Sequence, residues 1–258
     1  MLAVALGTLA VKTQAQNVIS WNFNANSTVN PTDTAGVVPA IHWTDTWLNN
    51  VTANLPDNQG NATTLSFDMT QTGGSSDWYL CHGYGPTAMS WSIGSHPGYD
   101  SDGTANKEML NGYLNDGISS WGCTITNSFA ALIGIPYSQY DIYVYFSADV
   151  AGRSGDARIG DTAYYFTTLG PAEVSGGNAL FTQATQTFDA GGSNPAADYA
   201  VFSGLTGSSQ TILLQMGVTD AWAGIAGFQI VAVPEPGTLA LGVLGGVMLV
   251  LDRHSKKS

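Results

Sequence analysis

Residues 140–146 read Tyr-Asp-Ile-Tyr-Val-Tyr-Phe, and this stretch decides the fold class. Six of its seven positions hold aromatic or β-branched residues, which are the residue types that favour strands. The stretch therefore predicts a β-strand. Short runs of related character lie on both sides of it, so the same prediction extends along the chain.

Before and after this strand, the chain contains short runs that are apolar or that alternate between apolar and polar residues. Clusters of Gly, Pro, Asn, Asp and Ser separate these runs. Further strands are predicted at 18–23, 64–69, 88–93, 123–129, 157–160, 163–168, 179–184, 199–202, 211–216 and 224–231. Gly160-Asp161 closes a hairpin between two of them. Only 107–114 and 44–50 have helical character. Short strands with turn signals between them predict an all-β fold, a jelly-roll-like β-sandwich.

The composition excludes several classes of protein. The 258 residues are 10% charged, with a formal net charge of −12, whereas an ordinary soluble domain is about 25% charged. Only seven residues are basic, and Lys107, Arg153 and Arg158 are the three in the body of the chain. Nucleic acid is excluded as a partner, because phosphate binding needs clustered Lys and Arg. The 44% of hydrophobic residues excludes a disordered acidic chain.

The N-terminal residues 1–15 have the pattern of a secretory signal peptide. An apolar run is followed by the small residues Thr13 and Ala15, so cleavage would leave Gln16 as the first residue. No Lys or Arg precedes the apolar run, which leaves a truncated start as one alternative and a buried first strand or helix as another. A single β-sandwich domain is then expected over 16–232.

The C-terminal segment 233–258 combines three features in a fixed order. They are the triplet Pro234, Glu235 and Pro236, an apolar helix predicted at 238–251, and a basic tail at 252–258. The helix would be about 21 Å long, shorter than the roughly 30 Å hydrocarbon core of a bilayer. It is therefore expected to be held in the inner membrane only transiently, with the basic tail on the cytoplasmic side.

This segment closely resembles the PEP-CTERM sorting signal of Gram-negative bacteria, with Pro234, Glu235 and Pro236 matching its motif. The resemblance implies processing at or near the triplet by an exosortase, a membrane-embedded transpeptidase of the cysteine type. It also implies export to the cell surface or to the extracellular polysaccharide matrix. The triplet would be a substrate site for that enzyme and implies no catalysis by this chain.

Parts of the body resemble the jelly-roll body of PEP-CTERM proteins, and they are similar overall to galactose-binding-like sandwiches. The phrases that carry this likeness are residues 110–114, 134–146 and 223–231. The resemblance implies a sandwich of the carbohydrate-binding kind without a defined ligand.

The two cysteines, Cys81 and Cys123, are expected to form one disulfide in an exported protein. The bond would close a loop of about 40 residues and would stabilise the fold by roughly 3–4 kcal/mol. Two buried free thiols are the alternative.

Aromatic residues give the candidates for glycan binding, because sugar rings stack on exposed aromatic faces. Trp21 and Trp91 fall within predicted strands, Trp222 lies just before the one at 224–231, and all three are expected in the core. Trp43, Trp47, Trp78 and Tyr79 stand in polar segments and are the glycan-binding candidates.

Calcium is the metal that the sequence fits best. Residues 99–108 offer the oxygen ligands Asp100, Asp102, Asn106 and Glu108. Their spacing differs from that of an EF-hand loop, and a turn that caps the helix at 107–114 is the alternative interpretation. No other cofactor is expected.

These observations favour an exported protein that is not an enzyme, with a structural or glycan-associating role and with extracellular polysaccharide as partner. A secreted polysaccharide hydrolase is the first alternative, and it would need two carboxylates about 5–9 Å apart. An ice-binding protein is the second alternative, but the regular Thr-x-Thr ladder that it would need is absent: pairs such as Thr124 and Thr126 occur singly. No Gly-x-Ser-x-Gly motif of a serine hydrolase is present.

Overall fold

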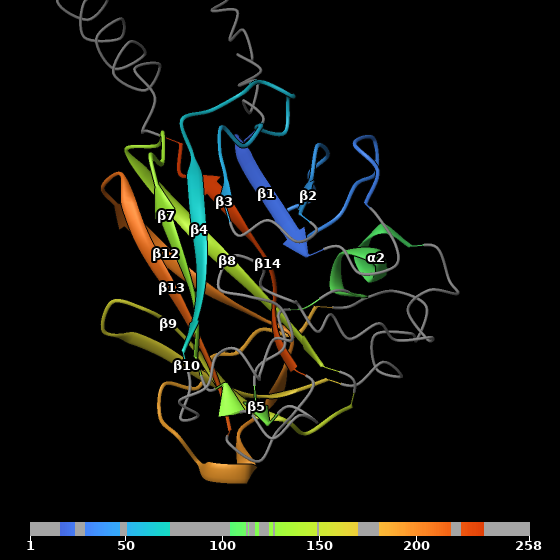
Figure 1. Ribbon diagram of the computed structural model, residues 1–258, viewed down its shortest axis with the longest axis vertical. Coiled ribbons are helices and arrows are strands. Elements are labelled where there is room, and N and C mark those ends of the chain that lie inside the picture. The colour runs from blue at the N-terminus through green and yellow to red at the C-terminus, as the bar shows by residue number, and fades with distance from the viewer. Residues whose placement is uncertain are drawn as a thin grey trace, which may run out of the picture.

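The computed structural model describes part of the 258-residue chain, and its strands form two sheets packed as a β-sandwich (Figure 1). The described residues are 16–23, 29–46, 51–72, 104–111, 113, 117–118, 124–125, 127–148, 150–169, 181–217 and 223–234. A seven-residue helix, α2 (Ala105–Asn111), lies beside β1 (Figure 1). The all-β sandwich that the sequence predicts is therefore confirmed.

The first sheet has five strands in the order β12-β8-β14-β1-β2. Their bounds are Tyr199–Thr206 for β12, Gln139–Ala148 for β8, Ala223–Ala232 for β14, Val18–Phe23 for β1 and Thr44–Thr46 for β2. β8 contains the stretch 140–146 and lies inside the sheet, between β12 and β14. Its apolar content follows from this position, because an inner strand covered on both faces has little contact with water.

The second sheet has seven strands in the order β11-β10-β9-β13-β7-β4-β3. Their bounds are Ala196–Ala197, Thr162–Thr168, Ser154–Ile159, Ser209–Met216, Asn127–Ile133, Ser66–Thr72 and Val51–Thr52 in that order. The predicted hairpin is present, since β9 and β10 pair antiparallel around Gly160-Asp161. A separate two-stranded ribbon joins β5 (Gly117–Ile118) to β6 (Thr124–Ile125).

The core lies between the two sheets. Trp21 is fully buried, and its ring contacts Phe67 of the opposite sheet at a centroid distance of 4.5 Å. Phe146 and Phe166 stack across the same interface with their centroids 3.6 Å apart. The expectation that Trp21 belongs to the core is therefore confirmed.

The outer face of the five-stranded sheet is covered by α2 and by residues 29–43, which we call the covering segment. Gln229 of β14 is fully buried and donates from Nε2 to the carbonyl of Val38 at 2.8 Å. Its Oε1 accepts from the Tyr145 hydroxyl at 2.5 Å, and that hydroxyl accepts from the Val37 amide at 2.8 Å. These bonds fix the position of Val37 beside β8.

Two local predictions are wrong. A helix was expected at 44–50, but Thr44–Thr46 forms β2, which pairs in parallel with β1. Edge pairing with a buried strand thus overrides the local preference of these residues. A strand was expected at 179–184, but residues 181–184 make only a single bridge, between Gln183 and Tyr199. The strand predicted at 88–93 lies outside the described residues.

Candidate binding site

One side of the sandwich is closed only in part. β12 is the outermost strand of its sheet, and β10 lies near the end of the other. Residues 181–186, which we call the bridging segment, connect the two edges. The Ala184 amide donates to the Tyr199 carbonyl of β12 at 2.8 Å, and the Tyr165 amide of β10 donates to the Gln186 carbonyl at 2.8 Å. Beyond this segment, the outer edge of β12 pairs with no strand in the described part of the chain.

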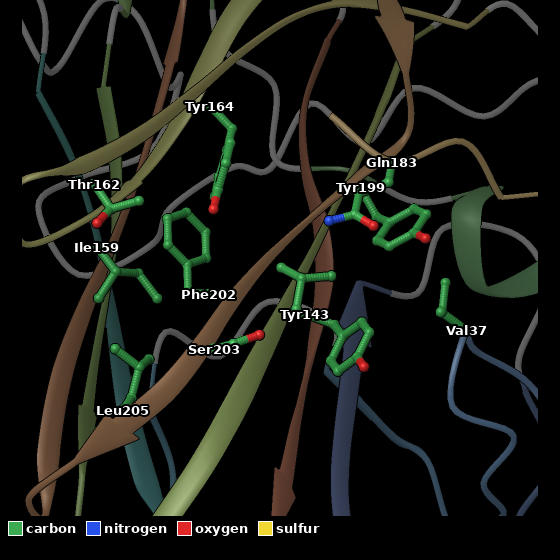
Figure 2. A pocket seen from close by; sticks show the side chains of 11 residues that line it. Val37, Tyr143, Ile159, Thr162, Tyr164, Gln183, Tyr199, Phe202, Ser203 and Leu205 are labelled. Atoms are coloured by element: carbon green, nitrogen blue, oxygen red, sulfur yellow. The ribbon is translucent and has the colours of Figure 1, made fainter. Parts of the chain in front are cut away.

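A cavity of about 490 Å³ lies at this place, and we call it the β12 pocket. It is lined by residues of β8, β9, β10, β12, the bridging segment and the covering segment (Figure 2). They are Val37, Tyr143, Ile159, Thr162, Tyr164, Gln183, Tyr199, Val201, Phe202, Ser203 and Leu205. The pocket therefore forms where six separate segments meet.

Two aromatic pairs dominate the lining, and Figure 2 shows them as two groups on either side of the β12 ribbon. Tyr143 and Tyr199 stack with their centroids 6.3 Å apart and an interplanar angle of 18°. Tyr164 and Phe202 are 5.2 Å apart and tilted by 60°. The division follows from strand geometry, because residues 199 and 202 of one strand point to opposite faces.

Among the described residues that line the pocket there is no Asp, Glu, Lys, Arg or His. Burial, together with the nearby carboxylate of Asp141, raises the pKa of Tyr143 above its ordinary value. Burial and the carboxylate of Asp198 do the same to the pKa of Tyr199. Both hydroxyls therefore stay protonated at neutral pH and can donate as well as accept hydrogen bonds. The described lining can therefore bind a polar ligand through uncharged donors and acceptors.

Asp198 supports the pocket from behind, at the point where the chain crosses from β11 to β12. Its side chain is buried, and Oδ1 accepts from the Thr182 amide at 2.8 Å. The Asp198 amide donates to the Thr182 carbonyl at 3.0 Å. Burial raises the pKa of Asp198 to about 7. This carboxyl thus holds the bridging segment, and with it Gln183, against β12.

Trp43 was expected to present a face to a sugar, and the structure places it elsewhere. Its side chain is only 4% exposed and packs against Tyr145. Its indole Nε1 donates to the carbonyls of Ala35 at 3.3 Å and Ala40 at 3.1 Å. The covering segment folds over the ring and satisfies its one polar atom, so Trp43 is a structural residue and cannot stack on a glycan.

Two of the calcium candidates are described, and they lie on α2. Asn106 uses its side-chain oxygen to accept from the Gly36 amide at 2.9 Å, which ties α2 to the covering segment. Burial and the nearby Asp33 raise the pKa of Glu108. Within the described ranges, no group of three or more His, Cys, Asp or Glu residues could hold a metal ion.

The remaining predicted site residues are mostly outside the described part of the chain. Those outside are Trp47, Trp78, Tyr79, Cys81, Asp100, Asp102, Cys123, Glu235 and Pro236. Pro234 is described, and it is exposed two residues after the end of β14. No helix in the described ranges is both long and apolar enough to cross a bilayer.

The pocket residues were not among the predicted ones. One signal was present, because Tyr143 alternates with Ile142 and Val144, which places it on the opposite face from these core residues. The pairing of β8 with β12, which brings Tyr143 to Tyr199, has no local signature in the sequence.

Comparisons with known proteins add no relative. A scan against models of protein families, a search of curated proteins and a search of solved structures find no match to this chain. The β12 pocket and the two terminal sequence motifs are therefore the features of this chain that indicate a function.

Proposed function

We propose that this chain is an exported, non-enzymatic β-sandwich protein that binds a neutral glycan in the β12 pocket. The main support for the proposal is the tyrosine-rich lining, in which none of the described side chains is charged. A sugar ring has an apolar face and a rim of hydroxyls, so it suits aromatic faces beside uncharged donors and acceptors. Gln183, Thr162 and Ser203 supply such polar groups around the tyrosines. An anionic ligand would instead need basic side chains.

The size of the pocket also supports a saccharide. Its volume of about 490 Å³ lies within the range of about 300–1,000 Å³ that is usual for small-ligand sites. Tyr143 and Tyr164, the half-buried members of the two aromatic pairs, lie on either side of β12 (Figure 2) and would contact a short saccharide from two directions. A site of this kind sets the orientation of a few sugar units, whereas a long chain would have to leave the pocket at its open side.

The hydrolase alternative finds less support at this pocket. Glycoside hydrolysis uses two carboxyl groups, one as acid and the other as base or nucleophile. The described residues of the lining include none, and the carboxyl of Asp198 behind them accepts from the Thr182 amide. Binding without bond cleavage is therefore the role that we propose.

Export is proposed from the two terminal motifs. The sandwich occupies the chain between them, since β1 begins at Val18 and β14 ends at Ala232. Residues 1–15 would direct secretion, and 233–258 would engage the inner membrane and an exosortase. The protein would then act at the cell surface or in the polysaccharide matrix of a Gram-negative bacterium. The resemblance of the body to galactose-binding-like sandwiches is in line with this setting.

Replacement of Pro234, Glu235 and Pro236 by Ala should leave an uncleaved precursor in the inner membrane, because the exosortase would lose its recognition motif. Fractionation of cells that make the exosortase, followed by immunoblotting, measures the precursor and the processed form. Replacement of Ser255 and Ser258 by Ala is the control, since it leaves the triplet and the basic residues in place. Normal processing of the triplet variant would contradict the proposed sorting.

The full-length protein, tested on a glycan array with and without calcium, should bind a neutral saccharide. Ser203→Trp should weaken this binding at least about tenfold, or by about 1.4 kcal/mol, because an indole ring would fill the pocket from its exposed edge. Ser208→Trp is the matched control, because Ser208 is also exposed and lies in the turn after β12, outside the lining. A blank array with folded protein, or equal binding by both variants, would overturn the proposal.

A further inference from the structure

The outer face of the seven-stranded sheet carries polar side chains in one straight row across four strands. Tyr165 of β10 lies directly opposite Asp156 of β9, Asp156 opposite Gln215 of β13, and Gln215 opposite Asn127 of β7. Residues that pair directly share a face of the sheet. Neighbouring strands are about 4.8 Å apart, so this polar row is about 14 Å long.

The neighbours of these residues show which face the row occupies. Three residues that are adjacent in the sequence to residues of the row belong to the core between the sheets: Ala157, Phe166 and Leu214. Side chains alternate along a strand, so the polar row points away from the core. Asp156, Tyr165 and Gln215 also line a second cavity of about 410 Å³ on this side of the molecule.

Contacts within the row hold its side chains in place. Arg158 donates from Nε and Nη2 to the Asp156 carboxylate, with the Nη2–Oδ1 distance at 3.2 Å. Its guanidinium lies 5.9 Å from the centroid of the Tyr165 ring. Gln215 donates from Nε2 to the side-chain oxygen of Asn127. The ion pair cancels the charge of Asp156, so the row combines hydrogen-bonding groups with little net charge.

The wall of the second cavity is also held by hydrogen bonds. Asn194 is buried, and its Oδ1 accepts from Gln186 Nε2 at 2.6 Å and from the Ala190 amide at 2.8 Å. Its Nδ2 donates to Asp189 at 3.0 Å, and its carbonyl accepts from the Thr167 hydroxyl at 3.1 Å. A binding wall that is fixed in this way loses little entropy when a ligand binds.

We propose that the polar row and this cavity form a second glycan site, which takes a neutral, linear polysaccharide lying across the strands. The guanidinium of Arg158 on β9, held by the buried carboxylate of Asp156, and the amides of Gln215 on β13 and Asn127 on β7 would meet hydroxyls of successive sugar units. The Tyr165 ring would contact one unit at the end of the row. The proposal rests on the proposed function for its class of ligand, but it uses none of the residues of the β12 pocket.

The two sites differ in what they require of the ligand. The β12 pocket is suited to a short saccharide, whereas the row gains contacts with each further unit until the chain spans about four strands. Affinity at the row should therefore rise with chain length. One protein with two separate glycan sites would also link two polysaccharide chains, with an avidity that neither site provides alone.

Calorimetric titration of the full-length protein with amylose, mannan, xylan and dextran, and with their di- to octasaccharides, tests the second site. We expect affinity to rise about tenfold or more between the disaccharide and the longest chain of the preferred glycan. Gln215→Ala should remove this rise. Gln215→Glu, which keeps the size of the side chain but adds a negative charge beside Asp156, should remove it as well.

The controls separate the two sites. Thr211→Ala changes an exposed residue on the same strand and face, and it should leave the rise with length intact. Ser203→Trp should weaken the binding of short saccharides at least about tenfold but retain the binding of long chains. Affinity that is independent of length, or insensitive to both Gln215 variants, would overturn the second site and leave the β12 pocket standing. No binding of any glycan would overturn both.

Discussion

Trp21→Ala should lower the free energy of unfolding by about 3–5 kcal/mol, the usual cost of removing a large aromatic side chain from a core. The Trp21 ring is fully buried, contacts Phe67 of the opposite sheet, and stacks on Phe228 with the centroids 5.5 Å apart. The variant would leave a cavity between the two sheets. Since a whole domain is stable by only about 5–15 kcal/mol, this loss is a large part of the total.

Urea unfolding monitored by circular dichroism measures the free energy of unfolding and does not depend on the fluorescence of the missing indole ring. Ile133→Ala is the matched control, because Ile133 is 60% exposed although it is a large apolar residue on β7. It should change the free energy of unfolding by no more than about 0.5 kcal/mol. If Trp21→Ala fell within the same range, the assignment of Trp21 to the interface between the sheets would be wrong.

The wild-type protein should become less stable as the pH rises, and Asp198→Asn should abolish this pH dependence. Burial raises the pKa of Asp198 from the ordinary value of 3.8 to about 7 in the folded protein. Below pH 3.8 the carboxyl is protonated in both states and has no effect. Between about pH 4 and pH 7 only the unfolded chain releases the proton, so the folded state becomes less stable. The total difference is about 4 kcal/mol, and it is complete above pH 7.

The free energy of unfolding, measured for both proteins from pH 4 to pH 8.5, checks this prediction. The variant should be the more stable one above pH 7, and the difference should shrink towards pH 4. The side-chain oxygen of Asn can still accept from the Thr182 amide, whereas Asp198→Ala removes both the charge and this acceptor. Asp198→Ala should therefore lose the same pH dependence but be less stable than Asp198→Asn at every pH. Parallel pH profiles for wild type and Asp198→Asn would contradict the account.

Local signals in the sequence predicted much of the fold. The run at 18–23 coincides with β1, the run at 140–146 lies within β8, and the hairpin at Gly160-Asp161 is present. These elements depend on residue type and alternation over a few positions, which a single sequence displays directly. The helix predicted at 107–114 corresponds to α2, which begins and ends somewhat earlier.

The candidate site is formed by contacts between segments that are distant in the sequence. Local sequence patterns do not reveal such contacts. Trp43 stands among polar residues, but the carbonyls of Ala35 and Ala40 and the ring of Tyr145 enclose it. Tyr143 and Tyr199 meet only because β8 and β12 pair. Burial and strand order arise from long-range packing, so local periodicity indicates the face on which Tyr143 lies but not the residue that it meets.

Hydrogen–deuterium exchange, with and without the neutral saccharide that binds most tightly on the array, tests the glycan pocket most directly. Tyr199 directs its carbonyl to Ala184, so by alternation the amide of Val201 also lies on the outer edge of β12, beside the pocket. Exchange over 199–205 and 159–164 should be slower when the saccharide is bound. A bound saccharide that leaves both stretches unchanged, or a protein that binds no neutral saccharide, would contradict this prediction.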